Sequence, residues 1–161
     1  MKKFLFLLVL FVLFFSSCVL LPVPKIAELE LTFNPNPVTD AYYDANNGWS
    51  FYSDVIIREK NNISVALGNY GPNGCCCYGQ IIVNGNIIET YYYDESEVRN
   101  WFGTLNVEGG SYIKEENALF TTGNYPLARI YETYYGKDEN GNLVSCSNTI
   151  ILDASKKMKK I

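Results

Sequence analysis

Three consecutive cysteines are the side chains whose spacing most directly suggests chemistry in this chain. Cys75, Cys76 and Cys77 stand side by side, and Cys146 follows about 70 residues later. In an oxidising compartment, one of the three could pair with Cys146, and a disulfide closing so long a loop would stabilise the fold by about 4 kcal/mol. A Cu(I) or Zn(II) thiolate site is the alternative, but zinc ligands are usually spaced by roughly two to four residues. The spacing therefore predicts a disulfide, with its connectivity open, and no metal ion.

Aromatic residues form the second candidate site. The chain has 13 tyrosines and two tryptophans. Tyr91 and Tyr93 share one face of an extended strand because side chains alternate along it, and with Trp49 and Trp101 they are the candidate ligand-binding residues. Exposed rings stack on sugars or anchor protein contacts, whereas packed rings stabilise a sheet by about 0.2–1 kcal/mol per cross-strand pair. A carbohydrate-binding surface would require a coplanar row of exposed rings.

The composition argues against catalysis. The chain contains no histidine, the side chain that most often serves as general base and as transition-metal ligand. Acids such as Glu115 and Glu116 could form a glycosidase pair only if they flank a cleft at a defined separation, which the sequence does not specify. We therefore predict a noncatalytic protein without a cofactor.

The N-terminal segment is typical of an export signal. A basic start at residues 1–3 precedes twelve apolar residues, 4–15, and two serines lead into Cys18. An apolar segment of this length is too short to cross a hydrocarbon layer about 30 Å thick as a helix. Removal of residues 1–17 would take away two lysines and leave 11 basic against 17 acidic residues, a net charge near −6. This negative charge disfavours nucleic acid as a partner.

The sequence Ser16-Ser17-Cys18 resembles the lipobox of bacterial lipoproteins. The resemblance implies that the signal peptide, residues 1–17, is cleaved before Cys18 and that acyl chains such as palmitate are attached to this cysteine. Several acyl chains hold a protein durably on a membrane, because each buried methylene contributes about 0.8 kcal/mol. Residues 18–25 would form a tether. The protein would then be exported and lipid-anchored in the cell membrane or outer membrane, facing the periplasm or the exterior.

The elements that would position the candidate residues are strands. Beyond the tether, apolar and polar residues alternate with a period of two, as in half-buried β-strands. This alternation predicts strands at 27–33, 49–59, 63–67, 80–83, 87–93, 104–107, 112–121, 127–135 and 143–152. Asn84 and Gly85 give the strongest hairpin signal. Ser96 could cap a short helix that runs to Phe102 and ends at Gly103.

Three stretches carry a resemblance to immunoglobulin-like or fibronectin type III-like domains of bacterial surface lipoproteins: Leu31–Val38, the strand beginning at Trp49, and Gly136–Asn142 before the last strand. The resemblance implies an all-β, immunoglobulin-like β-sandwich of about seven to nine antiparallel strands with one short helical turn, over residues 26–153. Residues 154–161 would form a basic C-terminal tail.

These expectations lead to three functional hypotheses. The first is a membrane-anchored exported lipoprotein that acts as a noncatalytic structural or protein-interaction module, with a protein or glycan partner. The second is a carbohydrate-binding surface lipoprotein that uses a Tyr/Trp platform. The third is a thiol- or metal-handling protein that uses Cys75–Cys77. Fold class alone does not choose among them, because sandwich folds share architecture without sharing function.

Overall fold

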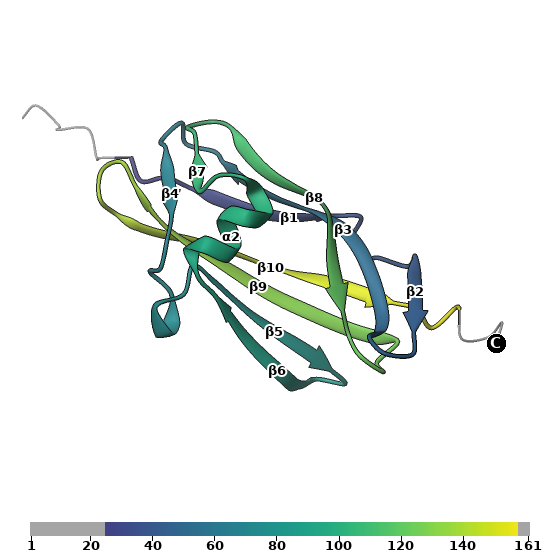
Figure 1. Ribbon diagram of the computed structural model, residues 1–161. Coiled ribbons are helices and arrows are strands. Elements are labelled where there is room, and N and C mark those ends of the chain that lie inside the picture. Colours follow the sequence, from purple (N-terminus) through teal and green to yellow (C-terminus); the bar gives the residue numbers. More distant parts are fainter. Residues whose placement is uncertain (1–24, 158–161) are drawn as a thin grey trace, which may run out of the picture.

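The computed structural model describes residues 25–157 and shows two antiparallel β-sheets packed face to face (Figure 1). The four-stranded sheet consists of β1 (Leu29–Asn34), β2 (Ala41–Asp44), β3 (Gly48–Glu59) and β8 (Tyr112–Thr121). The long strand β3 is its centre. β1 and β2 pair with successive parts of one edge of β3, and β8 pairs along the other edge.

The second sheet has six strands. They are β4 (Val65–Leu67), β5 (Cys77–Val83), β6 (Asn86–Tyr93), β7 (Asn106–Val107), β9 (Leu127–Asp138) and β10 (Leu143–Asp153). Strand β9 is central, because β10 pairs along its whole length while β5 and β4 share its opposite edge. β6 then extends the sheet beyond β5, and β7 extends it beyond β4.

One short α-helix, α2 (Glu95–Phe102), and one 3-10 turn, η1 (Pro72–Gly74), complete the described chain. The helix begins at a capping box in which the carboxylate of Asp94 accepts from the backbone N–H groups of Ser96 and Glu97. The cap is therefore Asp94 and not Ser96, because Ser96 already lies inside the first turn. Gly103 ends the helix with a φ of 72°, as predicted.

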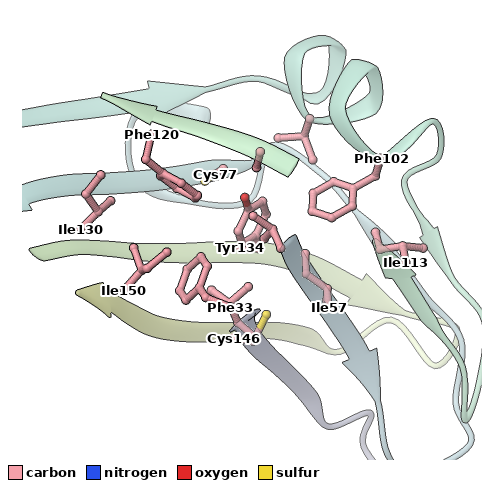
Figure 2. Packing of buried hydrophobic residues seen from close by; sticks show 14 of the residues in the cluster. Phe33, Ile57, Cys77, Phe102, Ile113, Phe120, Ile130, Tyr134, Cys146 and Ile150 are labelled. Carbon is pink, nitrogen blue, oxygen red and sulfur yellow. The ribbon is translucent and has the colours of Figure 1, made fainter. Parts of the chain in front are cut away.

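The hydrophobic core lies between the two sheets. Inward-facing side chains alternate along each strand, so Phe51, Val55 and Ile57 of β3 are buried. They face inward-pointing residues of β9 and β10, and Figure 2 shows Tyr134 and Ile150 within this packed cluster. Burying each such side chain stabilises the fold by about 1.5–3 kcal/mol. The prediction of an all-β sandwich is confirmed.

The two long flanks of the sandwich differ. On one flank β1 lies against β10, where the side-chain amide of Asn148 donates to the carbonyl of Leu31 at 2.7 Å. Val38 continues this seam opposite Leu152. Its N–H donates to the carbonyl of Ile151 at 2.8 Å, and its carbonyl accepts from the N–H of Asp153 at 2.9 Å. On the other flank the edge strands are β6 and β8, and each pairs with only one strand of its own sheet within residues 25–157. We call this second flank the open side.

The ends of the sandwich are also distinct. The described chain starts at Lys25 beside the β9–β10 hairpin, where the carbonyl of Ile26 accepts from Asn61 at 2.8 Å. The described C-terminal residues lie at the opposite end (Figure 1), where Lys157 donates to the carbonyl of Ala41 at 2.7 Å. We call the first of these the Lys25 end. Within residues 25–157, no helix is both long and apolar enough to span a membrane.

Most predicted strands match the structure in position, and the differences have local causes. Residues 25–157 contain ten strands, one more than the nine predicted segments. The additional strand is β2, whose pattern of half-exposed and exposed residues lacks the alternation that marks a strand. Two predicted strands are shorter than expected, at β4 and β7, because each pairs over only two or three residues.

Candidate ligand-binding site

A cavity of about 430 Å³ opens between the two sheets on the open side. Its floor is the inner face of β5, β6 and β9, and its roof is formed by β8 with Val55 of β3. Helix α2 contributes Glu97 and Trp101 at one end. The volume falls within the range of small-molecule pockets, which is about 300–1,000 Å³.

A row of three residues across the six-stranded sheet builds the floor. Tyr91 of β6, Gly79 of β5 and Glu132 of β9 lie directly opposite one another. A Cβ atom at Gly79 would lie only 2.0 Å from the Tyr91 ring, so glycine is needed for the ring to cross over β5. The Tyr91 hydroxyl thereby reaches across a whole strand and donates to Oε1 of Glu132 at 3.2 Å.

Glu132 is the most unusual side chain of the floor. It is 6% exposed, and its second oxygen, Oε2, accepts from the hydroxyl of Tyr134 at 3.3 Å. Burial raises the pKa of the Glu132 carboxyl to about 7, against the lowering effect of the two tyrosine hydroxyls, and the nearby Glu115 adds a further raising effect. The carboxyl group therefore changes charge near neutral pH.

Acidic groups surround this buried carboxyl. Glu115 faces the cavity from β8, and burial raises its pKa as well. Glu89 and Glu97 are exposed at the mouth. The described residues that line the cavity include no lysine or arginine, and neither Glu115 nor Glu132 has an ion-pair partner within residues 25–157. The cavity therefore brings together four ionisable carboxyl groups without a basic side chain among its described lining residues.

Aromatic rings form the wall beside these acids. The Tyr91 and Tyr93 ring centroids lie 5.0 Å apart with an interplanar angle of 53°, and Tyr93 meets Trp101 at 4.6 Å and 78°. The structure thus brings together three of the four predicted ligand-binding residues, from β6 and α2. The rings lie at steep angles to one another, so they line a corner of the cavity and do not form a coplanar row.

Trp49, the fourth candidate, lies elsewhere. It is 6% exposed and packs against Tyr43 of β2, with ring centroids 5.1 Å apart. Its backbone N–H donates to the carbonyl of Gly123 at 2.8 Å, which places it at the end of the sandwich opposite Lys25. Trp49 is therefore a packing residue and not part of the cavity.

The structure does not contain the predicted disulfide. Cys75, Cys76, Cys77 and Cys146 are all free and buried. Cys77 and Cys146 both lie opposite Tyr134, on the two flanking strands β5 and β10. Because one strand lies between them, their Cα atoms are about 10 Å apart. A disulfide requires a Cα–Cα distance below about 7 Å. The Tyr134 side chain fills the space between them.

Cys76 is no better placed. Cys76 forms backbone hydrogen bonds with Tyr93 on one side and Tyr135 on the other, so it too lies two strands from β10. Burial raises the pKa of the thiols of Cys76 and Cys146 to about 12, which keeps both protonated at neutral pH. Within residues 25–157, no group of three or more His, Cys, Asp or Glu side chains is placed to hold a metal ion. Cys18, the predicted lipidation site, lies outside the described residues.

The prediction from sequence missed Glu132 and did not place Glu115 in a site. A signal existed for Glu132. Glu132 occupies an inward position of its strand, in phase with the buried residues Ile130 and Tyr134. A carboxylate in the apolar phase of a strand indicates either a structural hydrogen-bond acceptor or a site, and only the surrounding residues decide which.

Comparisons with known proteins bear on the fold. No protein-family model matches the chain, and no curated protein sequence matches it. Among solved structures, the chain is similar to Northeast Structural Genomics Consortium target SoR45, with a TM-score of 0.54 and 12% identity over 80% of this chain and 87% of that chain. A putative ApaA protein from Bordetella pertussis has a TM-score of 0.49 and 10% identity over 83% and 99% of the two chains. At such identity, the similarity to SoR45 shows the sandwich fold alone.

Proposed function

We propose that this protein is an exported, lipid-anchored, noncatalytic binding module that receives a ligand in the cavity of the open side. The observation that carries the binding role is the convergence of five aromatic side chains and four carboxyl groups on one cavity of about 430 Å³. Apolar walls with a few convergent polar groups and a shifted pKa are the usual features of a binding site.

The export and the anchor are supported by the sequence. Residues 1–17 have the pattern of a cleaved signal, and Cys18 ends a lipobox-like segment. The tether at 18–25 would join the domain at its Lys25 end. Because the cavity opens on a flank and not at that end, the membrane would leave its mouth accessible.

The noncatalytic character is supported by the composition and by the contacts of Glu132. The chain contains no histidine, the side chain that most often serves as a general acid or base. Glu132 is further engaged by two tyrosine hydroxyls, which suits a fixed electrostatic partner better than a nucleophile.

Two measurements test this proposal. Metabolic labelling with palmitate in a bacterial host should label the wild-type chain and leave Cys18→Ser unlabelled; an unlabelled wild-type chain would contradict the anchor. For the cavity, a thermal-shift screen of small molecules should find compounds that raise the melting temperature of the wild-type protein.

The matched variant for the screen is Ala118→Phe, since Ala118 is buried on the roof of the cavity and a larger side chain would fill it. The variant should keep a cooperative unfolding transition and lose the shift. Compounds that stabilise both proteins equally bind elsewhere. A screen without any stabilising compound would contradict the binding role.

A further inference from the structure

We infer that the cavity of the open side binds a small organic cation that carries an ammonium group. This inference rests on the proposed binding function and names its class of ligand. The observation behind it is that three aromatic rings and two acids line the same part of the cavity. Tyr91, Tyr93 and Trp101 form a corner, which we call the aromatic corner, and it lies directly beside Glu132 and Glu115.

The geometry of the aromatic corner suits a compact cation. A cation is attracted by the faces of tryptophan and tyrosine rings when it lies within about 6 Å of their centroids. Neighbouring rings here are inclined by 53° and 78°, with centroids 5.0 and 4.6 Å apart, so one small group can touch more than one ring. A flat sugar would stack on a single ring face and would leave the others unused.

The charges of the cavity select the same ligand. Four carboxyl groups line or border the space, and no lysine or arginine is among the described residues of its lining. Two of these groups, Glu115 and Glu132, are partly or fully withdrawn from water and have no ion-pair partner within residues 25–157. A bound ammonium group would supply the missing counter-charge, and in a partly desolvated site this attraction is stronger than in water.

A metal ion fits the same residues poorly. Metal binding requires three or more ligand atoms that converge on one point, and no such group exists among residues 25–157. The two oxygens of Glu132 are each already engaged by a tyrosine hydroxyl. An organic cation needs no coordination bonds, because it is held by ring faces and by through-space attraction.

The inference predicts proton release on binding. Ionised Glu132 is the form that attracts a cation, so affinity should increase as the pH is raised through about 7. The titratable side chains around Glu132 and its cavity are Glu89, Tyr91 and Tyr93 of β6, Cys77 of β5, Tyr134 of β9, Glu115 of β8 and Glu97 of α2. Burial raises the pKa of the tyrosine hydroxyls and of the Cys77 thiol above their ordinary values, so these groups stay neutral up to pH 8. Ionisation of Glu115 attracts a cation in the same way as ionisation of Glu132.

The experiment is calorimetric titration of the full-length protein, in a nonionic detergent without a sugar headgroup, with choline and with its uncharged isostere 3,3-dimethylbutan-1-ol. We expect choline to bind about tenfold or more tightly than the isostere at pH 8, and less tightly at pH 5.5. N-acetyl-lysine methylamide is included to separate a free cation from a lysine side chain of a partner protein. Tighter binding of the lysine derivative than of choline would overturn the free-cation class.

The chain provides two matched pairs of variants. Glu115→Gln removes a cavity carboxylate, whereas Glu116→Gln changes its exposed neighbour, which pairs with Lys114. Tyr93→Leu removes a wall of the aromatic corner, whereas Tyr92→Leu changes an exposed residue of the opposite face. We expect each cavity variant to weaken choline binding about tenfold and each control to leave it within about twofold.

The outcomes separate the two levels of proposal. Equal binding of choline and its isostere, or tighter binding of a neutral disaccharide, would overturn the cationic ligand and leave the binding function standing. Choline affinity that is unchanged in Glu115→Gln and Tyr93→Leu would place the cation elsewhere and also overturn the inference. Failure of every probe, together with an empty thermal-shift screen, would remove the proposed function itself.

Discussion

Two regions of this molecule bury carboxyl groups, and they shift the pKa of these groups in opposite directions. At the Lys25 end, Glu59 and Asp138 are 1% and 4% exposed. On the open side, Glu132 is 6% exposed. Solvent exposure is therefore nearly the same for all three groups, but Glu132 lies deeper inside the protein than Glu59 and Asp138. The hydrogen-bond donors that each group meets differ as well.

At the Lys25 end, backbone N–H groups converge on the carboxylates. Glu59 accepts from four of them, including Asn61 at 2.7 Å and Gly110 at 2.8 Å. Burial by itself would raise the pKa of Glu59, but these hydrogen bonds outweigh it and hold the pKa below its usual value. Asp138 has the same balance, with burial opposed by hydrogen bonds from Asn142, Ala27 and Asn140, and its pKa is also lowered.

On the open side, Glu132 meets two tyrosine hydroxyls and another acid. Hydroxyl donors at 3.2 and 3.3 Å do not compensate for the loss of water, so its pKa is raised to about 7. The comparison shows that burial alone does not assign a role to an acid. A carboxylate whose oxygens accept several backbone hydrogen bonds holds loops in place. A carboxylate with few hydrogen bonds beside a cavity is available to a ligand.

The largest expected effect is at the Lys25 end. Glu59→Gln removes the negative charge and turns an amide NH₂ toward backbone N–H donors, which leaves buried donors unsatisfied. We expect a loss of about 3 kcal/mol in the free energy of unfolding, measured by urea denaturation at pH 7. Glu139→Gln, an exposed acid in the neighbouring hairpin, should change it by less than about 0.5 kcal/mol. Equal effects of the two substitutions would show that Glu59 does not hold this end together.

The corresponding change on the open side should have the opposite sign. Glu132→Gln keeps an acceptor for the tyrosine hydroxyls and abolishes the charge that burial disfavours. At pH 8 we expect the variant to be more stable than the wild type, by on the order of 2 kcal/mol. Destabilisation at pH 8 similar to that of Glu59→Gln would contradict the contrast between the two regions.

The pH dependence of stability should separate the regions further. The folded-state pKa of Glu132 is about 7 against an ordinary value of 4.5, so the folded state holds more protons between these values. Its contribution is complete below pH 4.5 and is lost as the pH rises to about 7. Glu59 has a lowered pKa, so its contribution is present above its ordinary pKa of 4.5 and is lost as the pH falls.

Denaturation of the wild type and of Glu132→Gln from pH 3 to pH 8 measures both trends. The decline in the free energy of unfolding between pH 5 and 8 should be smaller in the variant, while the loss of stability at acidic pH should remain in both proteins. A decline of the same size in the variant would show that groups other than Glu132 cause it.

A smaller effect is expected from the glycine that lets Tyr91 reach Glu132. Gly79→Ala would place a methyl group against the Tyr91 ring and break its hydrogen bond to Glu132. We expect a loss of about 1–2 kcal/mol in the free energy of unfolding. In a Tyr91→Leu background, Gly79→Ala should lower the free energy of unfolding by clearly less, since the ring that would clash is absent. An equal cost in both backgrounds would show that the ring does not depend on Gly79.

The smallest effect is expected at Cys146 of β10, on the flank where β1 lies against β10. Cys146→Ala should cost about 1 kcal/mol through lost packing, with the same value in the presence and absence of reductant. A loss of about 4 kcal/mol that occurs only without reductant would reveal a disulfide and contradict the free thiols. Thiol titration of the unfolded protein provides an independent measurement.

Much of the fold followed from local pattern. The two-residue alternation placed β3, β6, β8, β9 and β10 within a few residues of their bounds, because a strand with one buried face must alternate. The Asn84-Gly85 hairpin and the Gly103 helix end were confirmed for a similar reason, since both depend on backbone conformations that few residues adopt. The β2 strand was missed because its residues do not alternate in burial.

The site was only partly predictable. Tyr91 and Tyr93 share a face by alternation, but the sequence did not show that Trp101 of α2 joins them while Trp49 lies at the opposite end. The predicted disulfide is absent from the structure for a related reason. Loop length indicates how much a disulfide would stabilise a fold, but the strand order β5-β9-β10 decides whether the two sulfurs can meet.

The sequence by itself therefore determined most of the strands, the main turns and the side of each predicted strand that faces inward. Tertiary structure alone decided which inward positions became core, which became structural acceptors and which became a cavity. The physical reason is that alternation depends on neighbours along the chain, whereas the solvation of a carboxyl group depends on atoms from other strands. Glu59 and Glu132 both occupy inward positions of a strand. The surroundings that the fold gives them make Glu59 a structural hydrogen-bond acceptor and Glu132 a group that titrates near neutral pH.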